Sequence, residues 1–142
     1  MSNGDGTATC LLCGLPSKHG VLGVPSEKEV QDAIAQWLSY RGWMVHSTSQ
    51  IKASVGSDDG MPDLYCAREG ISLWVEVKKP VKPAPIRPSQ IAWFQSIHRH
   101  ESDTLMACVC DDVRKLMEWD GTRADLQESV WPEWAFRKVY SL

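Results

Sequence analysis

The stretch that decides the fold reads MPDLYCAREGISLWVEVK, residues 61–78. Its two apolar runs are separated by Glu69-Gly70, a turn signal, so we expect two strands joined as a hairpin. Side chains two apart on a strand point to the same face. Glu76 and Lys78 therefore project together, while the valines beside them point into a core. The hairpin would also bring Asp63, at the start of the first strand, close to Glu76.

Two carboxylates and an ammonium group on one face suit a site for metal and phosphate. Mg²⁺ and Mn²⁺ prefer oxygen ligands, which Asp63 and Glu76 would supply. A lone buried carboxylate inside LWVEV would be costly, and a cation partner explains Glu76 there. The backbone carbonyl of Val77 is expected as a further ligand. Lys78 would orient a water molecule or a phosphate oxygen, whereas Lys79 is expected to be an ordinary strand-end lysine.

These residues resemble the PD-(D/E)-x-K nuclease superfamily and, within it, the virus-type replication-repair nuclease (VRR-NUC) family. The matching pieces follow the family's order between about Glu27 and about Trp119. They are SEKEVQ (26–31), GMPDL (60–64), WVEVKKP (74–80) and PSQ (88–90). The resemblance implies a restriction-endonuclease-like core, which is a mixed central β-sheet flanked by helices. The order of elements expected from the residues themselves, helix, three strands, helix, strand and helix, also indicates an α/β fold.

The resemblance implies metal-dependent hydrolysis of DNA phosphodiester bonds, leaving a 5′-phosphate and a 3′-hydroxyl. No residue is expected to act as a covalent nucleophile. Small stand-alone members of the family are homodimers that cut branched DNA such as four-way (Holliday) junctions, so we expect a homodimer and a branched substrate here. Alternatives are a flap or other DNA-repair nuclease and a non-catalytic nucleic-acid-binding module.

The expected helices add two candidates to the site. Ser26 and Glu29 form the pattern of a capping box at the start of the first helix. Glu27 lies at the edge of that helix's apolar stripe and matches the family's helical glutamate, so we expect it to contact the metal through water, with Glu29 as the alternative. Gln90, in the first turn of the second helix, matches a glutamine near the family's active site. A plain helix-start role is the equal alternative for Gln90.

The N-terminal residues 1–24 are rich in Gly, Ser and Thr and are expected to form an irregular arm. Cys10 and Cys13 form a Cys-x-x-Cys pair, which is half of a structural zinc site, and His19 or a second copy of the chain in a dimer would supply further ligands. A zinc or redox protein built on this pair is a further alternative, although no second pair follows. The odd count of five cysteines argues against a disulfide framework.

At 142 residues the chain fits one domain, which we expect over residues 25–120. A polar loop is expected at 49–60 and a stiff, proline-rich connector at 79–88. The tail, residues 121–142, is unusually aromatic. It is expected to pack on the domain or on a partner subunit through Trp131, Trp134 and Phe136.

The net charge of the chain is −3, but one stretch is basic: residues 78–100 contain lysines and arginines and no acidic residue. Such a stretch beside the candidate site would follow a phosphate backbone. The residues expected to contact DNA are Lys52, Lys79, Lys82 and Arg87. No apolar run reaches the length of a membrane span and no signal peptide is evident, so we expect an intracellular protein, in the cytoplasm of a bacterial host if the chain is phage-encoded.

Overall fold

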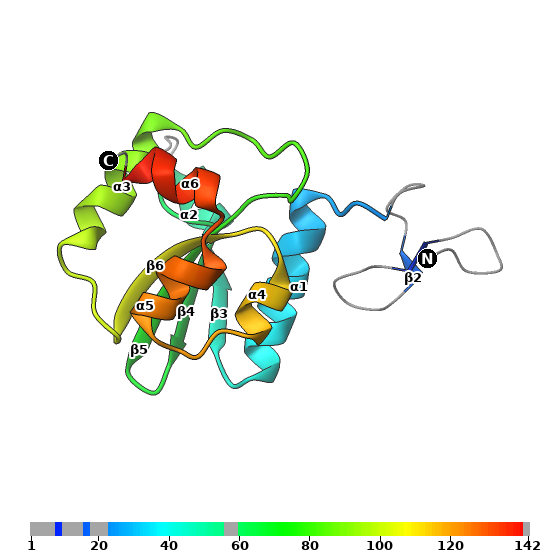
Figure 1. The fold of residues 1–142 in the computed structure, drawn as a ribbon, viewed down its shortest axis with the longest axis horizontal. Helices are drawn as coiled ribbons and strands as arrows, with labels where there is room; N and C mark the ends of the chain where they lie inside the picture. The colour runs from blue at the N-terminus through cyan, green and yellow to red at the C-terminus, as the bar shows by residue number, and fades with distance from the viewer. Residues whose placement is uncertain (1–7, 10–15, 18–22, 56–59, 141–142) are drawn as a thin grey trace.

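The chain forms a four-stranded β-sheet with helices packed against it (Figure 1). The computed structural model describes residues 8–9, 16–17, 23–55 and 60–140. Strands follow the order β3-β4-β5-β6, with antiparallel pairing of the first three and parallel pairing of β5 with β6. This confirms the predicted α/β class with a mixed sheet flanked by helices.

The bounds of the helices and strands follow the sequence pattern closely around the hairpin and less closely elsewhere. In chain order, the elements are β1 (Ala8–Thr9), β2 (Pro16–Ser17), α1 (Glu27–Tyr40), β3 (Met44–Ser47), α2 (Ser49–Val55), β4 (Leu64–Arg68), β5 (Ile71–Val77), α3 (Pro88–His98), β6 (Leu105–Cys110), α4 (Val113–Met117), α5 (Arg123–Asp125), the π-helical turn η1 (Leu126–Val130) and α6 (Glu133–Val139).

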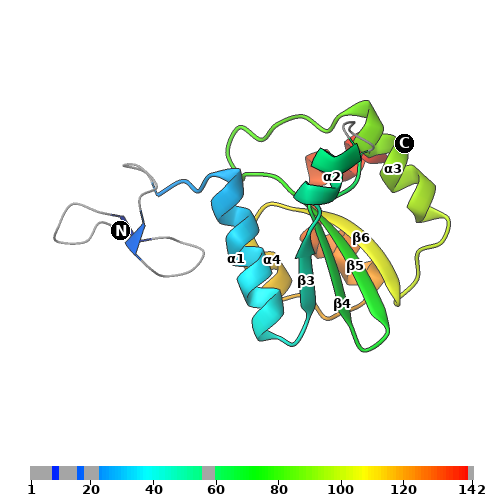
Figure 2. The same cartoon turned by 180° about the vertical axis from the view of Figure 1, so that it is seen from behind.

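The predicted hairpin is present as β4 and β5, which lie side by side in the middle of the sheet (Figure 2). Its turn consists of Glu69 and Gly70, with φ angles of 49° and 81°. Positive φ at both central residues is the geometry of the tight type I′ hairpin turn, whose twist matches that of the strands. The turn sets the register, in which Leu64 pairs with Val75.

Helix α1 begins where the capping box predicts. The Ser26 hydroxyl accepts the Glu29 N–H, and the Glu29 carboxylate accepts the Ser26 N–H, both at 3.2 Å. These bonds satisfy two of the backbone N–H groups that every helix start leaves without an intrahelical partner. The helix then buries Val30, Ile34 and Leu38, one face at the helical period.

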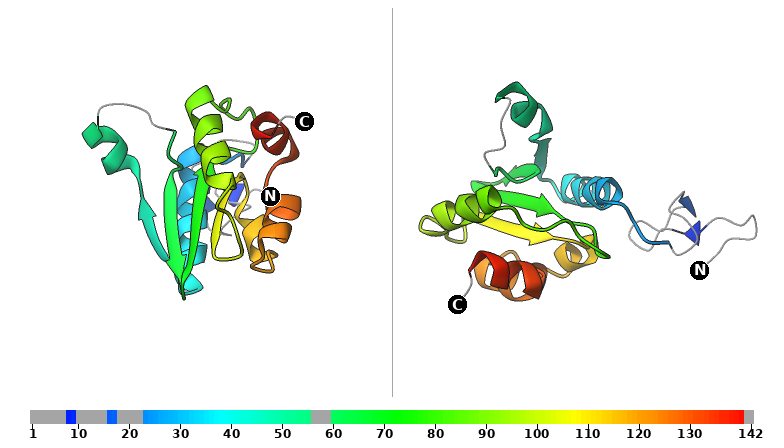
Figure 3. Two further views of the ribbon diagram at one scale, coloured as in Figure 1. Left: turned by 90° about the vertical axis from the view of Figure 1, so that its left-hand side faces the viewer. Right: turned by 90° about the horizontal axis from the view of Figure 1, so that it is seen from above.

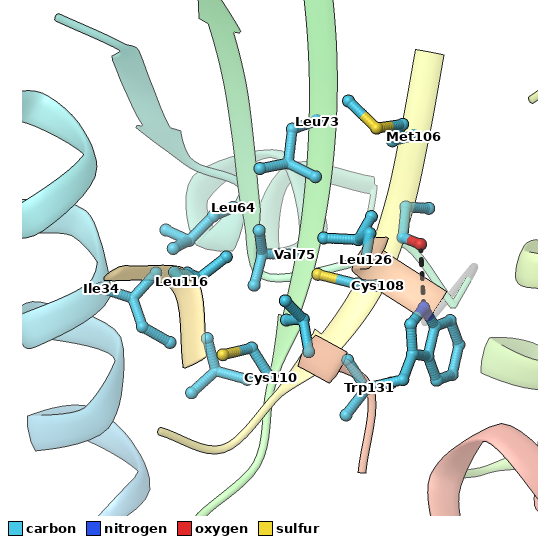
Figure 4. Close-up of a cluster of buried hydrophobic side chains, with 14 of the residues drawn as sticks. Ile34, Leu64, Leu73, Val75, Met106, Cys108, Cys110, Leu116, Leu126 and Trp131 are labelled. Atoms are coloured by element: carbon cyan, nitrogen blue, oxygen red, sulfur yellow. Dashed lines mark hydrogen bonds between the residues drawn. The ribbon is translucent and has the colours of Figure 1, made fainter. Parts of the chain in front are cut away.

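The hydrophobic core lies on one face of the sheet, against α1, α4 and η1. Leu73 and Val75 of β5 point to this side, where they meet Ile34 of α1 and Leu116 of α4 (Figure 4). The cysteines of β4 and β6, Cys66, Cys108 and Cys110, are also buried, as small core residues. Burial raises the pKa of the Cys66 thiol to about 12, so it stays protonated and unreactive.

Helix α3 covers the opposite face of β5. Trp74 on this face meets Trp93 of α3 edge to face, with ring centroids 5.3 Å apart. The chain reaches α3 through residues 79–87, which are neither helix nor strand and so match the predicted proline-rich connector. A parallel neighbour strand requires such a crossover. Because the crossover starts at the end of β5, it passes over the end of the sheet that carries Glu76.

One prediction of local structure was wrong, and two further local features were not predicted. The segment 49–60, predicted to be a polar loop, begins with helix α2. Its first three residues, 49–51, are exposed, and Ile51 retains 52 % of its accessible surface, so no apolar stripe marks the start of this helix. Two short strands, β1 and β2, pair within the arm predicted to be irregular. Helix α4 is capped by Asp112, whose side chain accepts the Arg114 N–H.

The aromatic tail packs against the domain. Residues of α5, η1 and α6 lie along β6 and next to α3 (Figure 3). Trp131 is 4 % exposed, and its indole N–H donates to the Ala107 carbonyl at 3.2 Å. Its ring also meets Phe94 of α3, with centroids 5.1 Å apart. None of the helices in the described ranges has the length and apolar composition that crossing a membrane requires.

The tail yields a stability prediction. Trp131→Ala removes a buried ring and leaves the Ala107 carbonyl without its donor, so the free energy of unfolding should fall by about 3–5 kcal/mol. Trp134, which is 39 % exposed, provides the control in the same segment, and its alanine variant should lose less than about 1 kcal/mol. Urea unfolding followed by circular dichroism measures both. Equal losses would contradict this assignment of the tail to the core.

Candidate active site

Asp63 and Glu76 meet at the open end of the hairpin. Leu64 pairs with Val75 in this antiparallel hairpin. Asp63, directly before β4, therefore lies opposite Glu76 of β5. One oxygen of Asp63, Oδ2, accepts the backbone N–H of Val77 at 2.8 Å. The charge of the Asp63 carboxylate raises the pKa of Glu76, so the two carboxyl groups are close enough to interact electrostatically. The structure therefore brings together the two carboxylates that the sequence predicts as metal ligands.

Thr48 holds the segment that presents Asp63. Its hydroxyl donates to the Pro62 carbonyl at 2.5 Å, and its N–H donates to the Asp63 carbonyl at 2.9 Å. Thr48 is 2 % exposed, so these bonds are shielded from water. Its own carbonyl accepts the Lys52 N–H in the first turn of α2. No local sequence pattern predicts this positioning role, because it depends on two segments fourteen residues apart.

Gly60 lies against the start of α3. It has a φ of 82°, and a Cβ on Gly60 would overlap the Ser89 carbonyl and the Gln90 N–H. Only glycine fits this approach without movement of the backbone. Gly60 thus fixes the distance between the Asp63 segment and the helix that carries Gln90.

Glu76 is 3 % exposed and is held from two sides. Its Oε2 accepts the side-chain N–H of Gln90 at 2.7 Å and lies 3.4 Å from the ammonium group of Lys78. Its other oxygen, Oε1, is buried and accepts no hydrogen bond from any side chain or backbone group in the described ranges. A buried carboxylate oxygen without a donor is costly, and it marks a position suited to a cation.

The pKa of Glu76 is raised to about 7, first by burial and second by the charge of the neighbouring Asp63 carboxylate. Lys78 and Lys52 act in the opposite direction but do not outweigh these two causes. The ion pair with Lys78 is therefore compatible with a raised pKa. Near neutral pH, the site holds a carboxyl group that a positive charge would readily deprotonate.

Gln90 contacts both the start of α3 and Glu76. Its side-chain oxygen accepts the Arg87 N–H at 2.9 Å, which caps the start of α3. Its side-chain nitrogen donates to Glu76. With each end of the amide occupied, the orientation of Gln90 is fixed, and it orients Glu76 in turn.

Four lysines predicted near the site divide into two groups. Lys78 is 4 % exposed and lies between Glu76 and the Pro85 carbonyl, 3.5 Å from the latter. Lys52, predicted to contact DNA, instead pairs with Asp63 Oδ1 at 3.3 Å. The connector carries half-buried Lys79 and exposed Lys82 outside the carboxylate cluster. No local pattern links Lys52 to Asp63, since the pair depends on α2 folding back toward the hairpin.

Two sets of predicted residues remain outside this cluster. Glu27 opens α1, which starts at the same end of the sheet (Figure 2), but no third acidic, histidine or cysteine side chain from the described ranges joins Asp63 and Glu76. A contact of Glu27 through water stays a prediction, as does the alternative role of Glu29. Arg87 is the last residue of the connector, and its side chain is exposed.

The predicted zinc ligands, Cys10, Cys13 and His19, lie outside the described residues.

The donor set fits Mg²⁺ or Mn²⁺. It offers oxygen ligands from two carboxylates, and Asp63 keeps 20 % of its side-chain surface accessible, which gives an ion a path. The Oε1 atom of Glu76, which accepts no hydrogen bond in the described ranges, is the oxygen that such an ion could use. Comparisons of the chain with protein-family models, with curated proteins and with solved structures found no match.

Substitution of Gly60 tests the positioning of the site. Gly60→Ala should force the Asp63 segment away from α3 and cost about 2–3 kcal/mol of stability, because the new methyl group meets backbone and the φ is unfavourable for alanine. Gly70→Ala is the matched control, since a Cβ there meets open space at a similar φ of 81°. Chemical denaturation should show a larger loss of stability for Gly60→Ala than for Gly70→Ala. A similar loss in both variants would show that φ alone matters.

The raised pKa of Glu76 predicts a pH dependence in the absence of metal. Between pH 4.5 and about 7 the folded protein holds a proton that the unfolded chain has released, so the free energy of unfolding falls as pH rises. Glu76→Gln keeps the shape and removes this slope. Relative to wild type, the variant should gain stability across that window, on the order of 3 kcal/mol at most. The free energy of unfolding of wild type and of Glu76→Gln is measured against pH in EDTA. Parallel curves for the two proteins would contradict the raised pKa of Glu76.

Proposed function

We propose that the chain is a metal-dependent nuclease that hydrolyses phosphodiester bonds of DNA. The observation that carries the proposal is the pair of neighbouring carboxylates, half-buried Asp63 and buried Glu76, with one Glu76 oxygen that accepts no hydrogen bond in the described ranges. Lys78 adds a buried ammonium group beside them. This combination follows the PD-(D/E)-x-K pattern in sequence, which supports the proposal. The proposal includes a restriction-endonuclease-like core built around the β4–β5 hairpin.

Asp63 and Glu76 would hold the metal, with the Val77 carbonyl as a further ligand. Once bound, such an ion polarises a phosphoryl oxygen and makes water a stronger nucleophile at neutral pH. The remaining work belongs to the chain. Gln90 keeps Glu76 in a single orientation, and Thr48 keeps the backbone of Asp63 in place.

Lys78 would stabilise the charge that develops on the phosphate. Its ammonium group is nearly excluded from solvent, and electrostatic stabilisation is stronger in such a site than in water. Lys52, which pairs with Asp63, neutralises one carboxylate when no metal is present and would exchange that role with the ion. Lys82 and Arg87, exposed on the connector beside the site, would bind backbone phosphates on either side of the cut.

Branched DNA acted on by a homodimer is the substrate we propose, by analogy with small nucleases of the family that the sequence resembles. A four-way junction has two-fold symmetry, and a C₂ dimer would present two equivalent sites to it. A panel of linear, flap and four-way-junction DNAs, incubated with Mg²⁺ or Mn²⁺, distinguishes this substrate from the flap alternative. Light scattering on the same sample gives the oligomeric state.

A non-catalytic nucleic-acid-binding module is the second candidate, and one observation favours it. Both carboxylates already have a lysine partner, at 3.3 Å for Asp63 and 3.4 Å for Glu76. A closed network of this kind would stabilise the hairpin without binding metal. DNA binding without cleavage in either metal would support this candidate over the nuclease.

Two adjacent lysines provide a matched test of the catalytic assignment. Lys78→Met should reduce the turnover number at saturating DNA by about 100-fold or more, the scale of one lost transition-state donor. Lys79→Met makes the same chemical change one residue away. It should leave turnover within about threefold while weakening DNA binding in a salt-dependent manner. Equal effects of both substitutions on turnover would contradict the assignment of Lys78 to the reacting face.

A further inference from the structure

A cavity opens at the far end of the sheet, away from the carboxylates. It encloses about 180 Å³ between the end of α1, the start of β3, the end of β4 and α4. Arg68, which lines it, is five residues from Asp63 along β4, or about 17 Å at the rise of a strand. Figures 1 and 2 show this end of α1 and the hairpin turn opposite the end that carries α2 and α3. The two sites are therefore separate.

Two arginines line this cavity, each stacked on a tryptophan. The Arg68 guanidinium lies over Trp43 at 4.9 Å from the ring centroid, and Arg41 lies over Trp37 at 5.5 Å. Stacking on an aromatic face restricts a guanidinium group and leaves its N–H donors pointing outward in its plane. The cavity thus has two positively charged groups ordered before any ligand arrives.

The donors of Arg68 are only partly used. One terminal nitrogen, Nη1, donates to the Arg41 carbonyl at 2.9 Å, which ties the two arginines together. The Nε–H of Arg68 is buried and has no acceptor within the part of the chain that the structure describes. A buried charged donor without an acceptor is unfavourable unless a ligand supplies one. The acceptor best matched to the guanidinium fork is a phosphate or carboxylate oxygen.

The charge of the lining limits the ligand further. Asp120 also lines the cavity. Its carboxylate accepts two hydrogen bonds from Thr122, at 2.7 and 2.8 Å, which lower its pKa and keep it ionised. Two arginines and one aspartate leave a single net positive charge. A phosphodiester carries one negative charge and matches it, whereas a terminal phosphate at neutral pH carries more.

Planar groups around the cavity indicate what else the ligand contains. Trp119 lies beside Trp43, with ring centroids 6.2 Å apart. Tyr40, which is 81 % exposed, stacks on Trp37 at the same end of α1. Nucleobases stack on aromatic rings and on arginine planes alike. An exposed tyrosine next to two stacked arginines is a surface of this kind.

We propose that this cavity binds one nucleotide of single-stranded DNA, with the phosphodiester held by Arg41 and Arg68 and the base stacked on the adjoining planar groups. This site is independent of the chemistry proposed for Asp63 and Glu76. Its binding can be measured in EDTA, where no cleavage occurs, so the failure of either proposal is distinguishable from the failure of the other.

The test measures the affinity of the full chain for a fluorescein-labelled oligothymidylate by anisotropy in EDTA. Arg41→Gln should weaken binding by at least about tenfold, the scale of one lost charge-assisted hydrogen bond, and Arg68→Gln by at least as much. Because Arg68 also donates to the Arg41 carbonyl at the end of α1, circular dichroism must show that the Arg68→Gln variant is folded. If that variant does not fold, the exposed Arg41→Gln variant decides the test. Arg137→Gln removes the same charge from an exposed ion pair on α6 and is the control, expected within about twofold of wild type.

Two competitors separate the parts of the ligand. An oligonucleotide of abasic sites should bind more weakly than oligothymidylate, because it keeps the phosphates and lacks the bases. Inorganic phosphate should not displace the strand at millimolar concentration. The proposal is overturned if wild type does not bind the strand, if Arg41→Gln binds as tightly as Arg137→Gln, or if the abasic strand or inorganic phosphate competes as well as the thymidine strand.

Discussion

The hydrogen bond from the Val77 N–H to the Asp63 carboxylate, at 2.8 Å, is the contact on which the candidate active site depends. It closes the open end of the β4–β5 hairpin with a side chain in place of a backbone carbonyl. As a result, the carboxylate of Asp63 lies beside that of Glu76 and both are held by the sheet. The remaining contacts of the site, from Thr48, Gly60 and Gln90, maintain this arrangement.

Such a site lowers the stability of the fold in which it sits. Two carboxylates at close range, one of them nearly excluded from water, raise the pKa of Glu76 and weaken the folded state above neutral pH. The core on the other face of the sheet offsets this cost. Val75 and Val77, which alternate with Glu76 along the same strand, are completely buried, and burying each contributes about 1.5–3 kcal/mol. Because side chains alternate along a strand, the valines of β5 pack in the core on one face while Glu76 lies in the candidate site on the other.

The sequence predicted the features that depend on neighbouring residues. Alternation along residues 71–78 placed Glu76 and Lys78 on one face, the Glu69-Gly70 pair predicted the turn, and Ser26 with Glu29 predicted the start of α1. Contacts between distant segments were not predictable in this way. The pairing of Lys52 with Asp63 depends on α2, a helix whose first three residues are exposed and show no apolar stripe. The cavity between Arg41 and Arg68 joins residues 27 positions apart in the chain and depends on how α1 meets the sheet.

The most direct test of the central claim is the position of Mn²⁺ in crystals grown with that ion, found from its anomalous scattering. A metal centre built on the hairpin predicts a peak within about 2.5 Å of an oxygen of both Asp63 and Glu76, with Lys52 moved away from Asp63. Absence of a peak there at saturating Mn²⁺, with Lys52 and Lys78 still paired to the two carboxylates, would contradict it. The cluster would then be a salt-bridge network that stabilises the fold.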